Sequence, residues 1–259
     1  MRGDNSSRLP ESAREELNLS AMRILLLGRG KTGSLVAEVA RARGHEVEAL
    51  RSTENPQASA LSGEKLATVD LVIDFTTPHC VQQNIQAAVR GGKDMVVGTT
   101  GWYGEMAAVR HEVERYRTGF ILGSNFSIGV NLFFDLVRAA APAIRFEYAA
   151  HIYERHLAQK KDAPSGTVTM MERLLREASG TETEITSFRE GEVVGMHELV
   201  FDSPHDTIYL CHDAKTRRGF AEGAVRAAEW LRGKKGFFDF NDVWREMLVD
   251  DAQLPKPVS

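Results

Sequence analysis

The chain has 259 residues, of which 42% are hydrophobic and 26% charged, a balance typical of a globular protein with one or two domains. The formal net charge of −4 gives no reason to expect a nucleic-acid partner, although a local basic cluster can still bind an acidic ligand. Two cysteines, Cys80 and Cys211, lie far apart without metal-ligand spacing, which argues against a disulfide scaffold or metal site and favours the cytoplasm.

The first 21 residues are polar and charged, and they lack the apolar core of a signal peptide. We interpret residues 1–21 as a flexible extension and Met22, directly before an apolar run, as a candidate functional start. No apolar run approaches the roughly 20 residues that a membrane helix needs, so the sequence predicts no membrane partner.

From Met22 onward, short apolar runs alternate with helical patterns. The expected strands are residues 22–28, 45–50, 69–75, 94–98 and 119–123, and the expected helices are residues 34–44, 81–92 and 103–116. Nearly continuous apolar strands, each followed by a helix, are typical of parallel strands covered on both faces. The pattern therefore predicts an α/β domain with a Rossmann-like, doubly wound parallel sheet over residues 22–126.

The pattern changes after about residue 127. The sequence predicts a longer helix, four strands with period-two alternation and two further helices, in chain order at residues 129–144, 145–154, 166–178, 185–190, 193–201, 206–213 and 219–232. This pattern indicates a second, α+β domain with a mixed or antiparallel sheet over residues 127–233. The C-terminal segment, about residues 234–259, is expected to return to the first domain with a final helix.

The first expected strand leads into a helix through a G-x-G-x-x-G pattern formed by Gly28, Gly30 and Gly33. In such a turn the first glycine permits the tight bend, the second admits a pyrophosphate, and the third lets helix and strand pack closely. The helix N-terminus then faces the phosphates. A purely structural turn is the alternative. The residues that we expect to bind a dinucleotide here are Gly28, Arg29, Gly30, Lys31, Thr32 and Gly33.

The second expected strand is followed by Arg51, Ser52 and Thr53, at the place where a dinucleotide fold reads the 2′ group of the ribose. A carboxylate would accept hydrogen bonds from a 2′-hydroxyl, whereas an arginine with hydroxyls suits a 2′-phosphate. The sequence thus predicts NADPH as the preferred cofactor over NADH. A solvated loop without a ligand is the other interpretation.

Small and polar residues also follow the fourth and fifth expected strands. Ligands of open parallel sheets lie beyond the carboxyl ends of the strands, so these residues are candidates for the nicotinamide and its ribose. Ordinary turns favour the same residue types, and that alternative stays open. The candidates are Gly98, Thr99, Thr100 and Asn125.

Residues 153–167, YERHLAQKKDAPSGT, combine a histidine with two lysines and a helix start. The unperturbed pKa of histidine lies near neutrality, so His156 suits general acid or base catalysis. Lys160 and Lys161 add positive charge. A carbon or imine that accepts a hydride also takes up a proton, which makes His156 a candidate proton donor. A structural histidine and solvent-facing lysines are the alternative interpretation.

A helix is expected to begin near Ser165, which can cap it. The first-turn N–H groups of Gly166 and Thr167 are then unpaired at the positive end of the helix dipole, and such a terminus binds anions. A capped helix needs no ligand, so this feature alone decides nothing. Together with His156, it predicts hydride transfer to an anionic substrate.

The segment ERHLAQKKDAPSGT is close to the pattern E-x-H-H-x-x-K-x-D-A-P-S-G-T, and the segments DFT, GTTG, NFSIGVN, GMHELVF, CHDAKTRRGFAEGAVRAAEWL and FDFNDV match as well. From Met22 to about residue 248 the chain resembles the 4-hydroxy-tetrahydrodipicolinate (dihydrodipicolinate) reductase family of the diaminopimelate route to lysine. The resemblance implies an NAD(P)H-dependent oxidoreductase that reduces a small-molecule dicarboxylate, 4-hydroxy-tetrahydrodipicolinate, to tetrahydrodipicolinate. It also implies a homotetramer assembled through the second domain.

The resemblance further implies individual roles. His156 matches the catalytic proton donor, and Lys160 matches the second catalytic residue. The residues that it implies for substrate binding are Ser165, Gly166, Thr167 and Arg217. The residues that it implies for nucleotide contacts are Gly98, Thr99, Thr100, Ser124, Asn125 and Phe126.

Two positions depart from the family pattern. Leu157 stands where the family has a second histidine, so one expected substrate contact cannot form. The glycine loop is one residue shorter than usual, with Lys31 and Thr32 in place of an Arg-Met pair, which affects the phosphate contacts. Two alternatives remain open: a related reductase of another cyclic or imino dicarboxylate, and a nucleotide-sensing protein of the same fold without turnover.

Overall fold

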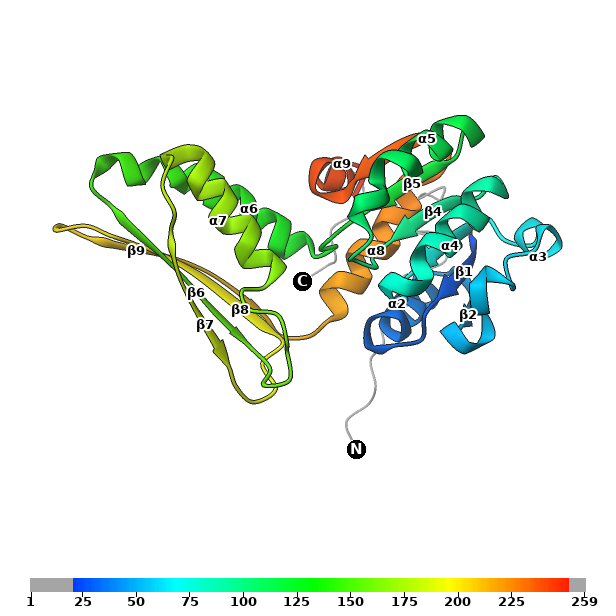
Figure 1. The fold of residues 1–259 in the computed structure, drawn as a ribbon, viewed down its shortest axis with the longest axis horizontal. Helices are drawn as coiled ribbons and strands as arrows, with labels where there is room; N and C mark the ends of the chain where they lie inside the picture. Colours follow the sequence, from blue (N-terminus) through cyan, green and yellow to red (C-terminus); the bar gives the residue numbers. More distant parts are fainter. Residues whose placement is uncertain (1–20, 252–259) are drawn as a thin grey trace. The chain divides into compact units, whose positions relative to one another are not determined.

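A computed structural model describes residues 21–251, and it divides into two compact units (Figure 1). Unit 1 runs to Gly123 and resumes at Ala224, and unit 2 spans Ser124–Gly223. The extension that we expected at residues 1–21 lies outside the described residues apart from its last position. The return to unit 1 begins inside a helix, earlier along the chain than the residue 234 expected from the sequence.

Unit 1 is built on a six-stranded parallel sheet in the order β10-β5-β4-β3-β1-β2. Its strands are β1 (Arg23–Leu27), β2 (Glu46–Leu50), β3 (Leu71–Asp74), β4 (Asp94–Val97), β5 (Gly119–Leu122) and β10 (Gly236–Asp239). The strand order reverses at β1, which pairs with β2 on one side and β3 on the other. Ligands of such sheets bind beyond the carboxyl ends of the strands at this switch point. The Rossmann-like prediction is confirmed.

The helices of unit 1 include the three that the alternation predicted after its strands, the predicted C-terminal helix, a short helix that was not predicted, and a helix that was predicted for the second domain and starts in unit 2. They are α2 (Lys31–Ala42), α3 (Gly63–Ala67), α4 (Pro78–Arg90), α5 (Met106–Tyr116), α8 (Arg218–Leu231) and α9 (Phe240–Asp251), with the short 3₁₀ turns η1 (Ser52–Glu54), η2 (Pro56–Ala58) and η3 (Tyr103–Glu105). Apolar faces of α4 and α5 pack with alternate residues of the strands, such as Leu25 and Val72, in one buried cluster. Burying each large aliphatic side chain contributes about 1.5–3 kcal/mol. Among the described residues, no helix is long and apolar enough to cross a membrane.

Unit 2 has a mixed four-stranded sheet in the order β7-β6-β8-β9. Its strands are β6 (Ala149–His156), β7 (Glu184–Arg189), β8 (Gly195–Asp202) and β9 (Thr207–Ala214), and its helices are α6 (Ile128–Ala140), the 3₁₀ turn η4 (Ala141–Phe146) and α7 (Gly166–Ser179). The β6–β7 pair is parallel and the other two pairs are antiparallel. The helices α6 and α7 lie along one face of the sheet and enclose a core with Ile152 and Phe201 (Figure 1). The predicted second domain, of α+β type with a mixed sheet, is confirmed.

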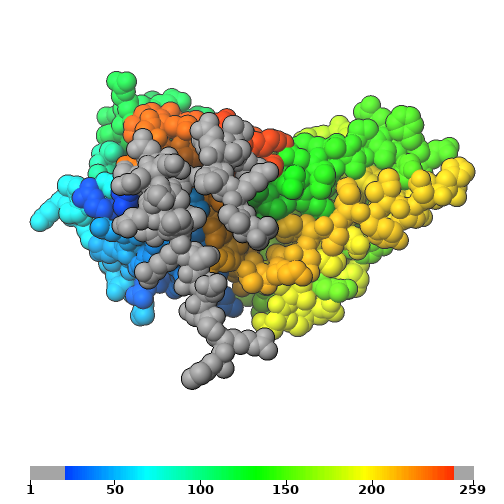
Figure 2. All heavy atoms as spheres, turned by 180° about the vertical axis from the view of Figure 1, so that it is seen from behind, coloured from blue at the N-terminus to red at the C-terminus, as the bar shows by residue number. Residues whose placement is uncertain are grey.

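The edge strand β9 is open to solvent, and the amber part of the surface in Figure 2 includes it. Its side chains Ile208 and Tyr209 are 40% and 65% exposed. Exposed aromatic and aliphatic side chains on an edge strand are typical of surfaces that pair with another chain.

One element of unit 1 was missed. The sequence predicted only a helix in the C-terminal segment, but β10 (Gly236–Asp239) pairs with β5 and completes the sheet. The segment GFFD has two apolar residues directly before the helix pattern, whereas the equally short strands β3, β4 and β5 have three each, so only the pairing identifies it as a strand. Phe237 stacks on Phe120 with ring centroids 5.1 Å apart, which anchors the added strand to the core.

Candidate active site

The turn between β1 and α2 has the geometry that its glycines predict. Gly28 has φ +98°, and a Cβ at this position would lie 2.1 Å from the carbonyl oxygen of Phe75. A Cβ at Gly33 would lie 2.0 Å from the carbonyl oxygen of Gly28. The close backbone packing therefore requires both glycines. A Cβ at Gly30 would meet nothing within 4 Å, so the chain leaves open space there. That space suits a phosphate group approaching the backbone.

A cavity of about 310 Å³ lies at the N-terminus of α2. Gly30, in extended conformation, precedes the helix without a side-chain cap, so the first-turn N–H groups stay available to an anion. The residues that line the cavity are Gly30, Lys31, Thr32, Gly33, Phe75, Thr76, Pro78, Gly98, Thr99 and Thr100. The structure thus gathers most of the predicted loop residues in one place. It adds Phe75, Thr76 and Pro78, which follow β3 and which the strand-end rule would also have indicated.

Beside this cavity, Asp74 at the end of β3 is completely buried. Its Oδ1 accepts hydrogen bonds from the hydroxyls of Thr99 and Thr76 (2.6 and 2.7 Å) and from the N–H of Thr76 (3.0 Å). Its Oδ2 accepts a hydrogen bond from Nδ2 of Asn84 at 2.7 Å. Burial raises the pKa of Asp74, against the effect of these donors. The carboxyl group holds in place two threonines that line the cavity.

The other nucleotide candidates are more scattered. Arg29 lines a second cavity of about 410 Å³, together with Arg41 and Glu48. Arg51 and Ser52 follow β2 and are exposed, and the N–H of Arg51 donates to Glu54 Oε2 at 2.6 Å. Neither Arg51 nor Ser52 lines the two cavities.

Ser124, Asn125 and Phe126 belong to unit 2, in the segment before α6. Asn125 Oδ1 accepts a hydrogen bond from the N–H of Ser127 at 2.9 Å, and Phe126 is buried. Asn125 also accepts, through its carbonyl oxygen, a hydrogen bond from the side chain of Asn131 at 3.0 Å. The structure therefore gives Asn125 a hydrogen-bonding role at the start of α6.

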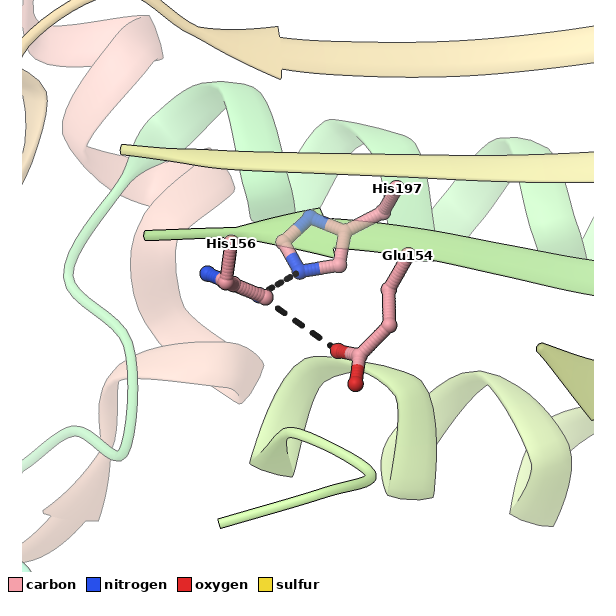
Figure 3. A group of neighbouring side chains, drawn as sticks. All are labelled: Glu154, His156 and His197. Carbon is pink, nitrogen blue, oxygen red and sulfur yellow. Dashed lines mark hydrogen bonds and ion pairs between the residues drawn. The ribbon is translucent and has the colours of Figure 1, made fainter. Parts of the chain in front are cut away.

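His156, the last residue of β6, is buried, with 8% of its surface exposed. Its Nδ1 lies 3.3 Å from the carbonyl oxygen of Val194. Its Nε2 lies 3.1 Å from Nε2 of His197 and 3.4 Å from Oε2 of Glu154 (Figure 3). Burial is the main cause that lowers the pKa of His156, and Lys160 lowers it further, while Glu154 acts in the opposite direction. Both ring nitrogens thus contact protein atoms in this structure.

Glu154 lies two residues earlier on β6, and its side chain is fully buried. Its Oε1 accepts hydrogen bonds from Arg189 Nη2 at 2.8 Å and from the Ser187 hydroxyl at 2.7 Å. The N–H of Ser165 lies 3.2 and 3.1 Å from its two oxygens. Burial alone would raise the pKa of Glu154, but these hydrogen bonds lower it to about 2. A buried, charged carboxylate therefore joins β6, β7 and the start of α7.

Sequence reasoning missed Glu154, Arg189 and His197 as parts of this cluster. Glu154 is the first letter of the quoted family pattern, and His197 lies in the quoted GMHELVF segment, so both had a sequence signal. Arg189 had none, because its place beside His156 follows only from the parallel pairing of β6 with β7.

Ligand-type atoms of Glu154, His156 and His197 lie within 4.8 Å of one another, a spacing that a metal ion can bridge. The sequence predicted no metal site. The oxygens of Glu154 already accept hydrogen bonds from Ser187 and from the Arg189 guanidinium, and a cation would have to displace that positive group. We therefore interpret the cluster as a hydrogen-bonded one.

Lys160 and the start of α7 also make hydrogen bonds within unit 2. Lys160 Nζ lies 2.8 Å from both carboxylate oxygens of Asp162, a partner that the sequence interpretation did not include. Ser165 caps α7 as predicted, because its Oγ accepts the N–H of Val168 at 3.3 Å. Gly166 is exposed, and a Cβ there would meet nothing within 4 Å, so the first turn of α7 is open to a ligand.

The last two candidates for substrate binding are Thr167 and Arg217. Thr167 is half-buried in the first turn of α7. Arg217 is half-buried just before α8, where its carbonyl oxygen accepts the N–H of Phe220 at 3.1 Å. Neither position adds a contact to the cluster around His156.

A parallel sheet whose first strand enters a helix through a glycine turn, with an open cavity at that helix start, defines the dinucleotide-binding class of proteins. Residues 22–126 match the family pattern described as "Dihydrodipicolinate reductase, N-terminus", and residues 129–244 match "Dihydrodipicolinate reductase, C-terminus". The chain belongs to the dihydrodipicolinate reductase family.

Individual relatives agree with this assignment. The chain is 35% identical over 241 residues to the 4-hydroxy-tetrahydrodipicolinate reductase of Christiangramia forsetii. The aligned region covers 88% of this chain and 99% of that protein. It is 34% identical over 223 residues to the protein of the same name from Methanoregula boonei, covering 80% and 81%. In fold it is similar to the dipicolinate-bound dihydrodipicolinate reductase from Paenisporosarcina sp. TG-14, with a TM-score of 0.71 and 22% identity over 86% of this chain and 100% of that chain.

Proposed function

We propose that this protein reduces 4-hydroxy-tetrahydrodipicolinate to tetrahydrodipicolinate with NAD(P)H, a step of the diaminopimelate route to lysine in the cytoplasm. The proposal rests on membership of the family over both units. The observation that carries it is the segment from His156 to Thr167, which leads from the end of β6 to the capped start of α7. It joins a titratable histidine to an anion-binding helix start.

The residues of unit 1 fit a nicotinamide dinucleotide, which supplies the hydride when bound. Gly30 leaves open space before the first turn of α2, where unpaired N–H groups favour phosphate. Thr76 and Thr99, held by Asp74, line the same cavity and offer hydroxyls to the sugar or the carboxamide. The chain's contribution is to bind the cofactor and to hold it still.

We propose NADPH as the preferred cofactor. No acidic residue directly follows β2, and Arg51 and Ser52 are exposed at that strand end. Arg29 and Arg41 line the neighbouring cavity, and their guanidinium groups favour a 2′-phosphate over a 2′-hydroxyl.

In unit 2, His156 is the proposed proton donor and the first turn of α7 the proposed carboxylate site, through Gly166 and Thr167. Because both nitrogens of His156 contact protein atoms, proton transfer requires a substrate atom to replace one of these contacts. Lys160 is held by Asp162, so a substrate carboxylate would compete with Asp162 for its ammonium group. Lys160 is the proposed second catalytic residue.

Leu157 favours a second candidate, a related reductase of another cyclic or imino dicarboxylate. Its half-buried apolar side chain follows His156 and offers no hydrogen bond to a substrate. A site that lacks one polar contact discriminates less strongly between similar dicarboxylates. Assays with other imino or oxo dicarboxylates separate the two candidates.

We also propose that the protein is a homotetramer assembled through unit 2. The exposed Ile208 and Tyr209 on the open edge strand β9 support this arrangement. Sedimentation of the full chain tests it, and a monomer at micromolar concentration would contradict it.

The reductase proposal is tested by a coupled assay with enzymatically generated substrate, run with NADPH and with NADH. We expect substrate-dependent loss of nicotinamide absorbance and a higher kcat/KM with NADPH. Tight NADPH binding without turnover would identify a nucleotide-sensing protein instead.

The residue test uses two histidines of the same strand. His156→Gln is expected to lower kcat roughly 10²–10⁴-fold, the usual contribution of a general acid or base. The matched control is His151→Gln, because His151 contacts Thr186 on β7 and lies outside the cluster. An equal effect of both substitutions would remove His156 from the mechanism.

A further inference from the structure

His197 lies on β8 directly opposite Glu154 of β6, and only 4% of its surface is exposed. Its Nε2 is 3.1 Å from Nε2 of His156 and 3.5 Å from Oγ of Ser165. Its Nδ1 is buried and has no hydrogen-bond partner. The ring therefore has one engaged nitrogen, and that nitrogen faces His156.

The hydrogen-bond partners of His156 decide which nitrogen of each of the two histidine rings carries a proton. The carbonyl oxygen of Val194 can only accept, so Nδ1 of His156 carries a proton in that contact. In the neutral ring Nε2 then has a free lone pair, which needs a donor. Glu154 is charged and cannot donate. The donor is therefore the Nε2–H of His197.

We propose that His197 is a positioning residue for His156: its Nε2–H holds the ring of His156 in one orientation and one tautomer. The inference rests on the proposed role of His156 as proton donor. It assigns His197 no contact with substrate or cofactor, because His197 acts only through the neighbouring ring.

The backbone of β8 supports the same arrangement. A Cβ at Gly195 would lie 2.8 Å from Cε1 and 3.2 Å from Nδ1 of His156, so this strand contacts one edge of the ring with bare backbone. Two residues further along β8, His197 contacts the other edge. Together Gly195 and His197 leave the imidazole little freedom to rotate.

His197 stays uncharged in this environment. Burial chiefly lowers its pKa, to about 3, and the nearby His156 and His212 lower it further. A neutral imidazole orients its neighbour by a hydrogen bond and places no second positive charge beside it. The charged groups that act on His156 are Glu154 on the same strand, Lys160 in the segment after β6 and Arg189 on β7.

The test compares three variants of the full chain. His197→Leu removes the donor, and His197→Gln keeps an N–H donor. His212→Gln is the matched control, because its ring stacks beside His197 at 6.3 Å on the same sheet. We expect His197→Leu to lower kcat roughly 10–100-fold with KM changed less than about twofold, as for a reacting group misplaced by a fraction of an ångström. His197→Gln recovers most of this loss, and His212→Gln retains the parent activity.

The pH profile separates positioning from general loss of structure. Without His197, Nε2 of His156 loses the donor that favours its neutral form and keeps Glu154 as an acceptor at 3.4 Å. The pKa that limits kcat should then rise by roughly half a unit or more. An unchanged profile and unchanged kcat in a folded His197→Leu protein would overturn the proposal.

The tautomer of His156 can be measured in the unsubstituted protein without turnover, and a variant is needed only to assign its signal. Nitrogen-15 NMR of the eight histidines, with His156 assigned through His156→Gln, reports its tautomer directly. We expect the proton on Nδ1. A proton on Nε2 of the neutral ring would overturn the proposal, whereas absent turnover with the expected tautomer would overturn only the proposed reaction.

Discussion

Two carboxylates, one in each unit, are completely buried, yet their environments differ in kind. Asp74 in unit 1 receives hydrogen bonds from two hydroxyls, an amide and a backbone N–H, all uncharged, and burial raises its pKa. Glu154 in unit 2 has the Arg189 guanidinium at 2.8 Å as well as neutral donors, and its pKa falls to about 2. Burial alone therefore does not decide the charge of a carboxyl group, because hydrogen-bond donors oppose its effect on the pKa. At Glu154 the donors of Ser165, Ser187 and Arg189 outweigh burial, whereas at Asp74 burial outweighs the uncharged donors.

The difference matches what each carboxylate does. Asp74 fixes two threonines that line the cavity at the start of α2, a task that needs geometry and no net charge. Glu154 faces His156, the proposed proton donor, and a fixed negative charge favours the protonated form of that histidine. Four predictions test this contrast, starting with the largest effect.

Removing the cation should be the most damaging change. Arg189→Met leaves Glu154 buried without its cation, and breaking a buried ion pair in this way costs about 3–5 kcal/mol. Hydrogen exchange in peptides of β6 and α7 measures the loss. The control is Arg155→Met on β6, whose exposed pair with Glu190 contributes no more than about 1 kcal/mol. Equal losses would mean that Arg189 does not compensate the buried charge.

Lowering the pH should reduce the folding stability of unit 2, because Glu154 becomes protonated. A carboxyl group whose pKa is lowered on folding contributes stability above its unfolded value of 4.5, and that stability is lost as the pH falls towards about 2. The loss amounts to about 3 kcal/mol. Glu154→Gln removes this dependence, so its cost should be larger at pH 7 than at pH 3. Denaturant unfolding at the two pH values measures it, and a cost independent of pH would contradict the pairing.

The contribution of Asp74 to stability should change with pH in the opposite direction. A carboxyl group whose pKa is raised on folding stabilises the protein below its unfolded value of 3.8, and this stability is lost as the pH rises through the folded pKa. Asp74→Asn should cost about 1–3 kcal/mol, because an amide then faces the Asn84 amide, and the cost should shrink as the pH rises. Thermal unfolding across pH 4–8 and the Kd for NADPH test it. A cost that grows with pH would mean that Asp74 is held in its charged form.

The smallest effect concerns a neutral donor to Glu154. Ser187→Ala removes one hydrogen bond, and we expect a loss of about 1 kcal/mol because Arg189 still compensates the charge. Thr99→Val in unit 1 should cost more, since only uncharged donors remain around Asp74. Urea unfolding of both variants gives the comparison, and the reverse order would contradict the contrast.

The sequence carried the features that are local along the chain. The packing of Gly33 on Gly28, the strand–helix alternation and the Ser165 cap all depend on neighbours a few residues away, and each was predicted. The contacts made by Arg189 and His197 join residues more than thirty positions apart and follow only from the pairing of β6 with β7 and β8. Hydrophobic period carries no information about such pairing.

The C-terminal strand β10 completes a sheet that begins near the other end of the chain. During synthesis, all residues of unit 2 leave the ribosome before β10 does, so the middle of the protein can finish folding first. Until β10 has left the ribosome, the edge of β5 stays unpaired, and this exposed edge makes the newly synthesised chain a target for chaperones or for aggregation.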